Sequence, residues 1–340
     1  MKAIAFYQNL PIQQAEALQD IELPVPEASG HDLLVEVKAV SVNPVDTKVR
    51  LGSAPPAGQA RVLGWDAAGV VRAVGELVTH FKVGDEVWYA GSIARPGSNA
   101  EYQLVDERIV GRKPGNLPYD QAAALPLTAL TAWELLFDRL QVNSEDSQAS
   151  ILVVGAAGGV GSILIQLLKQ LTAFAIIATA SRPASRDWLL QLGADHVLDH
   201  GATGEGNNMQ SQLQQLGLPP VDYVIGLNKT DQHFSSMVEM LKPQGKLALI
   251  DDPEFIDVRL LKRKSLSLHW ELMFTRSLFG TADMIRQHDI LNTIADMVEQ
   301  GQITSTVQQH LGKINAENLR QAHALIEQGK SIGKLVLEGF

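Results

Sequence analysis

The segment that most constrains the fold is "ILVVGAAGGVGSILIQLL", residues 151–168. Its first four residues are an apolar run that predicts a buried strand. After the glycines, isoleucines and leucines recur at three- and four-residue spacing, which predicts a helix with one broad buried face. A strand, a glycine turn and a helix in this order begin a βα unit, so the segment predicts a parallel sheet.

The glycines of this turn keep the spacing of the dinucleotide-binding fingerprint G-x-G-x-x-G, with alanine at its first position. A missing side chain at Gly158 lets a pyrophosphate approach the helix N-terminus, and one at Gly161 lets the helix pack on its strand. A lone glycine pattern can also be a tight turn, but the flanking strand and helix favour dinucleotide binding. The residues expected at the cofactor are Ala156, Gly158, Gly159, Val160 and Gly161.

The end of the next strand bears on which dinucleotide fits. A carboxylate about 20 residues after the glycines would hold the ribose hydroxyls of NAD. The sequence has "TASRPASR" there, residues 179–186, with no carboxylate. Ser181 offers a hydroxyl, and Arg182, with Arg186 as a helper, offers a guanidinium that binds phosphate oxygens in bidentate fashion. Although solvated loop arginines are common, this set favours NADPH over NADH as the cofactor.

The rest of the chain divides into a β-rich part and an alternating part. Residues 1–110 contain short strands separated by Gly, Pro, Asn and Asp, a pattern typical of a β domain. Helical spacing begins in 119–137, and from about residue 150 strands and helices alternate up to an edge strand at 265–270. In the tail, 313–340, a helix precedes a last strand expected to return to the first domain. The expected fold class is α/β: a mostly-β domain plus a doubly wound parallel sheet.

Composition excludes several function classes. The chain of 340 residues has no cysteine, which excludes disulfides, thiol nucleophiles and cysteine-based zinc sites. A net charge of −10 leaves no broad basic surface, so nucleic acid is not an expected partner. The most apolar segments stop well short of the roughly 20 residues that span a bilayer, and the N-terminus lacks a signal-peptide pattern. We therefore expect a cytoplasmic protein that does not enter the membrane.

Six motifs are spread over the chain: "AVSVNPVDTKVRLG" (39–52), "VLGWDAAGVVRAVG" (62–75), "KVGDEVW" (82–88), "ALPLTALTAWELL" (124–136), "VVGAAGGVGSILIQLLK" (153–169) and "LGADHVLDH" (192–200). With them, the chain resembles the medium-chain dehydrogenases/reductases nearly end to end. The likeness is to their zinc-free quinone oxidoreductase branch, which includes zeta-crystallin. The stretches "TASRP", "LKPQGKLALID" and "SLHWELMFTRS" resemble the subgroup often called zinc-type alcohol dehydrogenase-like.

This resemblance implies a two-domain oxidoreductase. A GroES-like catalytic domain is expected at 1–120, completed by about 275–340, and a Rossmann NADP-binding domain at 121–274. The family holds the nicotinamide in the cleft between the two domains. It also implies a homodimer joined through the edge strands of the two cofactor sheets.

The resemblance also carries over site residues. Asn43 and Asp46 fall on the segment that borders the active site, and Thr128 falls near the nicotinamide and the phosphates. Zinc alcohol dehydrogenases bind their catalytic metal with a cysteine and a histidine, whose positions here are Asn43 and Trp65, and the lobe for structural zinc is missing. An amide and an indole do not replace thiolate and imidazole, so no metal is expected. Trp65 either fills the vacated metal site or forms a wall for a flat acceptor. Asp66 is either structural, bonded to backbone or an arginine, or takes part in the active site.

The loss of the metal restricts the chemistry. Without zinc, an alcohol or a carbonyl lacks the Lewis acid that polarises it. Quinones and α,β-unsaturated carbonyls delocalise the incoming charge, so hydrogen bonds, one of them expected from Asn43, are enough. The expected reaction is hydride transfer from NADPH to a quinone-type acceptor. Reduction of carbon–carbon double bonds in enones or enals is the nearest alternative, and a non-catalytic NADPH-binding redox sensor or structural protein is an alternative of another class.

Two histidines lie four residues apart, a spacing that can place metal ligands on one face of a helix. His196 and His200 straddle the end of a predicted strand, where this spacing does not place them on a shared helical face. They are therefore not expected to bind a metal.

Overall fold

The computed structural model describes residues 1–202 and 207–340. These residues form two compact units: Met1–Leu130 with Met273–Phe340 form the first, and Thr131–Leu272 form the second. In the part of the chain that is described, no helix is both long and apolar enough to cross a membrane.

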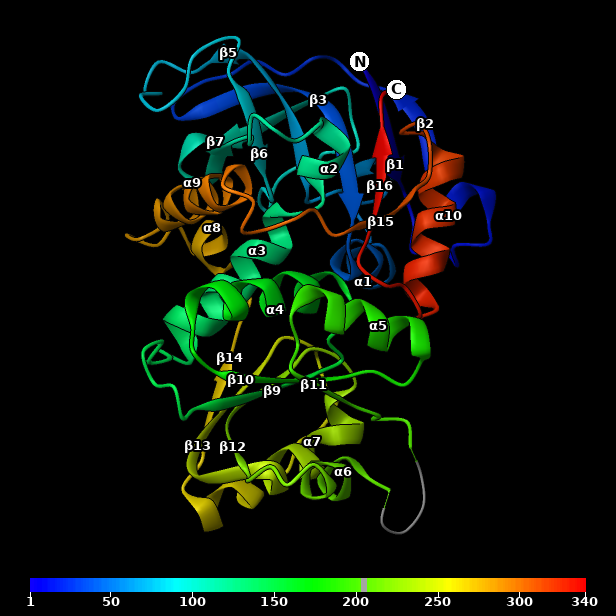
Figure 1. Ribbon diagram of the computed structural model, residues 1–340. Coiled ribbons are helices and arrows are strands. Elements are labelled where there is room, and N and C mark those ends of the chain that lie inside the picture. Colours follow the sequence, from blue (N-terminus) through cyan, green and yellow to red (C-terminus); the bar gives the residue numbers. More distant parts are fainter. Residues whose placement is uncertain (203–206) are drawn as a thin grey trace. The chain divides into compact units, whose positions relative to one another are not determined.

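The second unit is built on a sheet of six parallel strands (Figure 1). Their order is β11-β10-β9-β12-β13-β14, so the chain starts in the middle, moves to one edge and then crosses to the other. This is the doubly wound order, and the predicted sheet with its late edge strand is confirmed. The strands are β9 (Ser150–Val154), β10 (Ala175–Thr179), β11 (His196–Leu198), β12 (Val221–Gly226), β13 (Leu241–Leu249) and β14 (Ser267–Trp270).

Helices cover both faces of this sheet. Figure 1 shows α4 and α5 on one side of the strands and α6 and α7 on the other. A strand covered on both faces needs apolar side chains on both, and all five residues of β9 are buried. The helical elements are η3 (Glu134–Arg139), α4 (Gly159–Leu171), α5 (Pro183–Leu192), α6 (Met209–Gln215), α7 (Thr230–Met240) and η4 (Val258–Lys264).

The first unit is mostly β, as predicted. Its larger sheet has the order β15-β16-β3-β5-β6-β8 with β7 also paired to β3, and a smaller sheet has the order β2-β1-β4. The strands are β1 (Lys2–Phe6), β2 (Gln19–Glu22), β3 (Asp32–Val42), β4 (Arg61–Val62), β5 (Ala67–Val74), β6 (Glu86–Tyr89), β7 (Tyr102–Asp106), β8 (Val110–Arg112), β15 (Val307–His310) and β16 (Lys334–Glu338).

The C-terminal segment completes the first unit. Strand β16 pairs antiparallel with β3, and Leu335 lies opposite Val42, so the predicted return of the last strand is confirmed. This register brings Lys334, the first residue of β16, beside Asn43, the residue that follows β3. The helical elements are η1 (Ala15–Ala17), α1 (Pro44–Gly52), η2 (Glu107–Ile109), α2 (Tyr119–Ala123), α3 (Pro126–Trp133), α8 (Thr275–Phe279), α9 (Arg286–Glu299) and α10 (Ala316–Glu327).

Candidate functional site

The turn between β9 and α4, residues 155–161, is the candidate cofactor loop. Gly155 has a φ of +76°, a conformation that L side chains rarely adopt. A Cβ on Gly161 would lie 2.0 Å from the carbonyl oxygen of Ala156, so this glycine is needed for the helix to pack on the turn. A Cβ on Gly158 would meet no described atom within 4 Å. Backbone conformation thus accounts for Gly155 and a close packing contact for Gly161, and the space beside Gly158 is open.

That open space lies at the N-terminus of α4, whose N-cap is Gly158. The first backbone N–H groups of a helix have no acceptor inside it, and the helix dipole makes this end positive. Ala156 is buried, whereas Gly159 and Val160 keep part of their surface exposed. A loop of small residues before a free helix N-terminus fits a pyrophosphate group.

The three residues proposed for the 2′-phosphate lie after β10. Ser181 and Arg182 are exposed, and Arg182 is the N-cap residue of α5. The Nη1 of Arg186 donates to the carbonyl oxygen of Val197, 2.5 Å away. Arg186 therefore already binds the backbone of β11, and Ser181 and Arg182 are the freer pair.

A buried polar cluster lies where β3 ends and β16 begins. Lys334 Nζ donates to Asn43 Oδ1 at 2.5 Å and to Asp66 Oδ2 at 2.9 Å. Asn43 Nδ2 donates to the same Asp66 oxygen at 3.1 Å and to the carbonyl oxygen of Ser41 at 3.4 Å. The backbone N–H of Leu127 donates to Asp66 Oδ1 at 3.1 Å. All three side chains are at least 97% buried, so this is a sealed ion pair with an amide beside it.

Asp46 borders this cluster. Asn43 is the N-cap of α1, and its backbone N–H donates to Asp46 Oδ2 at 2.6 Å in a capping box. Burial raises the pKa of Asp46 to about 7. Burial also raises the pKa of Asp66, against the opposing effect of Lys334. Two buried carboxyl groups therefore lie near one ammonium, and Asp66 is the one that forms the hydrogen-bonded ion pair with it.

Trp65 and Thr128 are also buried. The Trp65 ring packs edge-on against Phe274 with 6.3 Å between ring centroids, and its Nε1 donates to the carbonyl oxygen of Ser92 at 3.0 Å. No part of Trp65 is exposed, which supports a space-filling role. The Thr128 hydroxyl donates to the carbonyl oxygen of Leu125, one turn back in the chain, at 3.0 Å.

Lys334 is the residue that sequence reasoning missed. Its contacts join positions 43 and 334, which the linear sequence does not connect. A usable signal was present: a lysine opens the apolar strand "KLVLE", which was itself predicted to return to the first domain. A charged residue at the start of such a strand is a candidate partner for a buried carboxylate.

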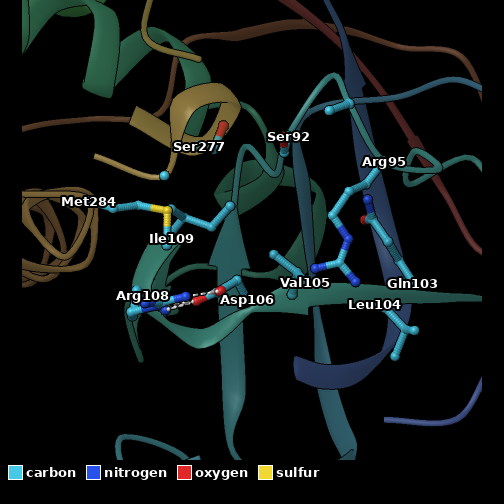
Figure 2. Close-up of a pocket in the computed structure, with 12 residues that line it drawn as sticks. Ser92, Arg95, Gln103, Leu104, Val105, Asp106, Arg108, Ile109, Ser277 and Met284 are labelled. Atoms are coloured by element: carbon cyan, nitrogen blue, oxygen red, sulfur yellow. Dashed lines mark hydrogen bonds and ion pairs between the residues drawn. The ribbon is translucent and has the colours of Figure 1, made fainter. Parts of the chain in front are cut away.

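A pocket of about 210 Å³ lies in the first unit, and Ser92, Ile109 and Met284 are among the residues that line it (Figure 2). Arg95 and Arg108 line it, but Arg95 binds Asp32 with both terminal nitrogens at 2.7 Å, and Arg108 binds Asp106 at 2.7 and 2.9 Å. Its cations are thus neutralised, and its volume is below the roughly 300–1,000 Å³ of typical ligand sites. We do not assign the acceptor to it.

Comparison with known proteins identifies the family. The family model described as "Zinc-binding dehydrogenase" matches residues 192–337. The family model described as "Alcohol dehydrogenase GroES-like domain" matches residues 29–115. A zinc-type alcohol dehydrogenase-like protein of Staphylococcus epidermidis is 39% identical over 341 residues, 99% of each chain. A Rhizobium etli structure, provisionally described as a zinc-dependent alcohol dehydrogenase, is 52% identical with a TM-score of 0.95 over 100% of this chain and 98% of that one. The chain belongs to the medium-chain dehydrogenases/reductases.

More distant members of this superfamily differ in what their descriptions say. A quinone oxidoreductase of Pseudomonas syringae is 26% identical, with a TM-score of 0.81 over 99% of each chain. A mycobacterial protein complexed with NADPH is 27% identical, with a TM-score of 0.83 over 99% of this chain and 100% of that one. A 2-methylene-furan-3-one reductase of Solanum lycopersicum is 41% identical over 210 residues, 59% of this chain and 52% of its own. The chain is thus an oxidoreductase of a superfamily that uses nicotinamide cofactors.

The names of several of these medium-chain relatives imply zinc, and the residues at the expected catalytic position do not fit it. Zinc sites use thiolate, imidazole and carboxylate ligands. Here the carboxylate of Asp66 and the amide oxygen of Asn43 both accept hydrogen bonds from the Lys334 ammonium, and the Trp65 indole has no lone pair to offer. A cation brought to these oxygens would have to displace one that the protein already supplies.

One other group of possible metal ligands occurs among the described residues. Single ligand atoms of Asp120, His310 and Glu338 lie within 4.8 Å of one another. His310 Nδ1 accepts the backbone N–H of Gly312 at 3.1 Å, so in the neutral ring the proton is on Nε2, which faces Glu338 at 3.8 Å. This 3.8 Å separation is an exposed charge contact and not a hydrogen bond, and His310 Nδ1 already accepts a backbone N–H, so we assign no metal to the group.

Proposed function

We propose that this medium-chain reductase transfers hydride from NADPH to a quinone-type acceptor without a metal. The observation that carries the proposal is the Lys334 ammonium, held between Asn43 Oδ1 and Asp66 Oδ2. Because a protein cation takes the oxygens that a metal would need, the acceptor must react without a Lewis acid. Quinones meet this condition, since their reduced forms delocalise the negative charge. The likeness to a quinone oxidoreductase supports the same acceptor class.

The phosphate end of the cofactor is assigned to the second unit. Backbone N–H groups from Gly158 to Gly161 would hold the pyrophosphate, and Ser181 with Arg182 would hold the 2′-phosphate. When bound, the nicotinamide supplies the hydride. The NADPH complex of the mycobacterial relative supports this choice of cofactor.

Two glycine variants of the proposed cofactor loop separate an effect on NADPH binding from an effect on stability. Gly158→Ala should unfold like the wild type, because the added methyl group meets no described atom within 4 Å, yet it should weaken NADPH binding about tenfold or more. Gly161→Ala is the matched control, and it should lower the free energy of unfolding because its methyl group would lie 2.0 Å from a carbonyl oxygen. Fluorescence titration and urea unfolding measure the two effects. Normal NADPH binding by Gly158→Ala would remove the loop from the cofactor site.

The choice between NADPH and NADH has its own variant. Arg182→Ala should weaken NADPH by about 1–3 kcal/mol, the cost of losing a charged hydrogen bond, and leave NADH nearly unchanged. Equal losses for both cofactors would refute the 2′-phosphate assignment.

On the acceptor side, Asn43 has little hydrogen-bonding capacity to spare. Its amide oxygen accepts from Lys334, and its two N–H groups donate to Asp66 and, at 3.4 Å, to the Ser41 carbonyl. The long bond to Ser41 is the one that could be exchanged for a bond to an acceptor oxygen. We therefore propose that Asn43 contributes at most one hydrogen bond to the acceptor and that the remaining proton comes from solvent.

A steady-state screen tests the acceptor class. NADPH oxidation should be fast with 1,4-naphthoquinone and slow with 2-alkenals, and a chelator should leave the rate unchanged because no metal takes part. Zinc analysis of the purified protein is the companion measurement. A rate that depends on stoichiometric zinc would sink the proposal.

Reduction of the carbon–carbon double bond of an enone is the second candidate function. The likeness to a 2-methylene-furan-3-one reductase supports it over the matched part of the chain. Turnover of 2-alkenals without turnover of naphthoquinone would favour this candidate over the first. Tight NADPH binding with no turnover of either acceptor would favour a non-catalytic sensor or structural protein.

We also propose a homodimer joined through β14. This strand ends the sheet of the second unit, and its last residue, Trp270, is 49% exposed. An open edge with an exposed aromatic residue is a surface that proteins usually cover. Light scattering should give the molar mass of a dimer for the wild type and a lower average molar mass for Trp270→Lys at the same concentration. A monomeric wild type would contradict the proposal.

A further inference from the structure

A second cavity of the first unit, of about 240 Å³, lies beside the smaller sheet. The residues that line it do not include Asn43, Asp66 or Lys334, so it is separate from the polar cluster that supports the proposed function. Most of its wall is apolar. The apolar side chains that line it include Met1, Leu23, Pro24, Val62, Pro96 and Ala100.

Small side chains in the smaller sheet account for the shape of this cavity. Ala3 and Ala5 are two residues apart on β1 and therefore point to one face, and Ala100 forms a β-bridge with Ala3. These alanines pack with Val62 in one buried apolar cluster, and the longer side chain of Leu23 packs against it. Methyl groups beside longer side chains leave a hollow, which gives a ligand apolar surface to bury.

One polar group in the cavity wall lacks a partner. Gln103, on β7, is only 4% exposed, and its Nε2 donates to the carbonyl oxygen of Pro96 at 3.0 Å. Because that carbonyl can only accept, the amide nitrogen faces it and the amide oxygen is turned away. Gln103 Oε1 finds no hydrogen-bond partner within residues 1–202 and 207–340. A buried acceptor without a donor is unfavourable, so a ligand that brings a donor to this oxygen binds more tightly.

The charge and the size of the cavity restrict the class of ligand. Arg95 in its wall binds Asp32 with both terminal nitrogens at 2.7 Å, and the N-terminal ammonium of Met1 donates to the Leu23 carbonyl oxygen at 2.6 Å. The charged groups thus have partners already, which favours a neutral ligand. An apolar cavity of about 150 Å³ holds a benzene molecule, so this cavity has room for one substituted ring and not for a drug-sized molecule.

We propose that this cavity is a binding site for a small neutral phenol. The ring lies among the apolar side chains, and the hydroxyl donates to Gln103 Oε1. The site goes beyond the proposed reaction and does not rest on it, because neither the candidate cofactor loop nor the polar cluster around Lys334 takes part. A failure of this proposal therefore leaves the proposed function untouched, and the reverse also holds.

Methionine methyl groups distinguish this cavity from the neighbouring pocket of about 210 Å³, which shares Arg95, Gln103 and Leu104 with it (Figure 2). Met1 lines only the proposed cavity, and Met284 lines only the neighbouring pocket. In the full chain labelled with ¹³C at the methionine methyls, phenol should shift the Met1 signal in a saturable way and leave the Met284 signal in place. Leucine variants of the other methionines assign the signals.

A second ligand and three variants test the individual contacts. Toluene, which has a methyl group in place of the hydroxyl, should bind about tenfold more weakly than phenol, and Gln103→Met should bind phenol as weakly as toluene. Leu23→Trp should fill the cavity and weaken phenol about tenfold or more. Ala94→Trp, in the wall of the neighbouring pocket alone, is the matched control and should bind phenol like the wild type. Unfolding midpoints are measured for every variant.

Three results would overturn the proposal. The first is a Met1 signal that phenol does not shift. The second is normal phenol binding by Leu23→Trp with loss of binding by Ala94→Trp, which would place the ligand in the neighbouring pocket. The third is equal affinity of the wild type for phenol and toluene, which would remove the hydrogen bond to Gln103 and with it the ligand class. If Gln103→Met does not fold, this last comparison decides, because it needs no variant.

Discussion

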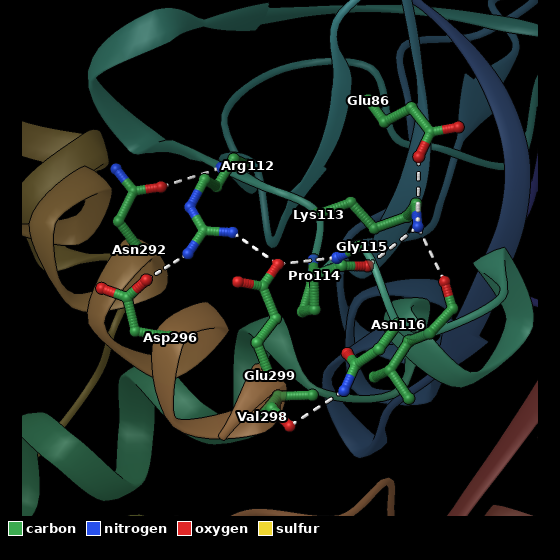
Figure 3. A network of polar contacts seen from close by, with 11 residues as sticks. Glu86, Arg112, Lys113, Pro114, Gly115, Asn116, Asn292, Asp296, Val298 and Glu299 are labelled. Atoms are coloured by element: carbon green, nitrogen blue, oxygen red, sulfur yellow. Dashed lines mark hydrogen bonds and ion pairs between the residues drawn. The ribbon is translucent and has the colours of Figure 1, made fainter. Parts of the chain in front are cut away.

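Two polar networks tie the C-terminal segment to the rest of the first unit, and they differ in their contact with water. In the sealed cluster, defined as Lys334, Asn43, Asp66 and Asp46, the paired Lys334 and Asp66 side chains are 3% and 0% exposed. In the surface network (Figure 3), Arg112 binds Asp296 and Glu299 of α9, and the three side chains are 40%, 59% and 36% exposed.

Both networks join a residue in or next to a strand of the N-terminal segment to an element beyond residue 273, so the two do not differ in the segments that they connect. They differ in how far their side chains are exposed to water. A surface ion pair loses little hydration when it forms and gains little electrostatic attraction. It typically contributes about 0–1 kcal/mol to the free energy of unfolding. A buried ion pair is not in itself a large source of stability, but removing one partner leaves a desolvated charge, which costs about 3–5 kcal/mol. The comparison therefore predicts very different responses to equivalent substitutions.

The largest effect should come from Lys334→Met. This change leaves Asp66 without its cation and Asn43 Oδ1 without its donor, so the free energy of unfolding should fall by about 3–5 kcal/mol in urea denaturation at pH 7.5. Adding Asp66→Asn to this variant removes the stranded charge while keeping an oxygen for the Leu127 N–H, and it should recover much of the loss. A Lys334→Met loss below 1 kcal/mol would mean that the cluster is no more sensitive than the surface.

The next effect is a pH dependence that belongs to Asp46. Its pKa of about 7, against an ordinary value of 3.8, means that between these pH values the folded protein keeps a proton that the unfolded chain releases. The stabilisation from this group is complete below about pH 4 and is lost as the pH rises toward 7, by at most about 4 kcal/mol. Asp46→Asn cannot titrate and still offers an oxygen to the Asn43 backbone N–H. The unfolding free energies of the wild type and of Asp46→Asn should be measured from pH 4.5 to 7.5. As the pH rises, the difference between them should shift in favour of the variant. Parallel profiles for the two proteins would contradict the assignment.

The sealed cluster also marks where sequence reasoning stops. The capping box around Asn43 is local, because "NPVD" places an asparagine before a proline and an aspartate three residues later. The candidate cofactor loop, residues 155–161, is local too, which is why its strand, turn and helix could be predicted together. For Asp66, the sequence left open a bond to backbone, a bond to an arginine or a part in the active site; in the structure it accepts the Leu127 N–H, and its cation is a lysine.

The remainder depends on strand register, which no local pattern encodes. Lys334 becomes buried only because β16 pairs with β3 so that Leu335 lies opposite Val42. A shift by one residue would turn the β16 side chains to the other face of the sheet. In the same way, His200 and the backbone N–H of Gly155 meet only through the hydroxyl of Thr179 on the neighbouring strand. Long-range pairing was predicted for these strands, but the side chains that meet across it could not be.

The smallest effect should come from Arg112→Gln, and its salt dependence makes the comparison sharp. Arg112 Nη1 lies 2.8 Å from Glu299 Oε1, which also accepts the Gly115 backbone N–H at 2.8 Å, so the glutamate keeps one partner after the substitution. The loss in unfolding free energy should be below about 1 kcal/mol at low ionic strength and close to zero at 1 M salt, where screening acts within about 3 Å. The Lys334→Met loss should not change with salt, because water and ions do not reach Asp66. Equal salt sensitivity of the two variants would mean that solvent reaches the sealed cluster, and the distinction between the two networks would fail.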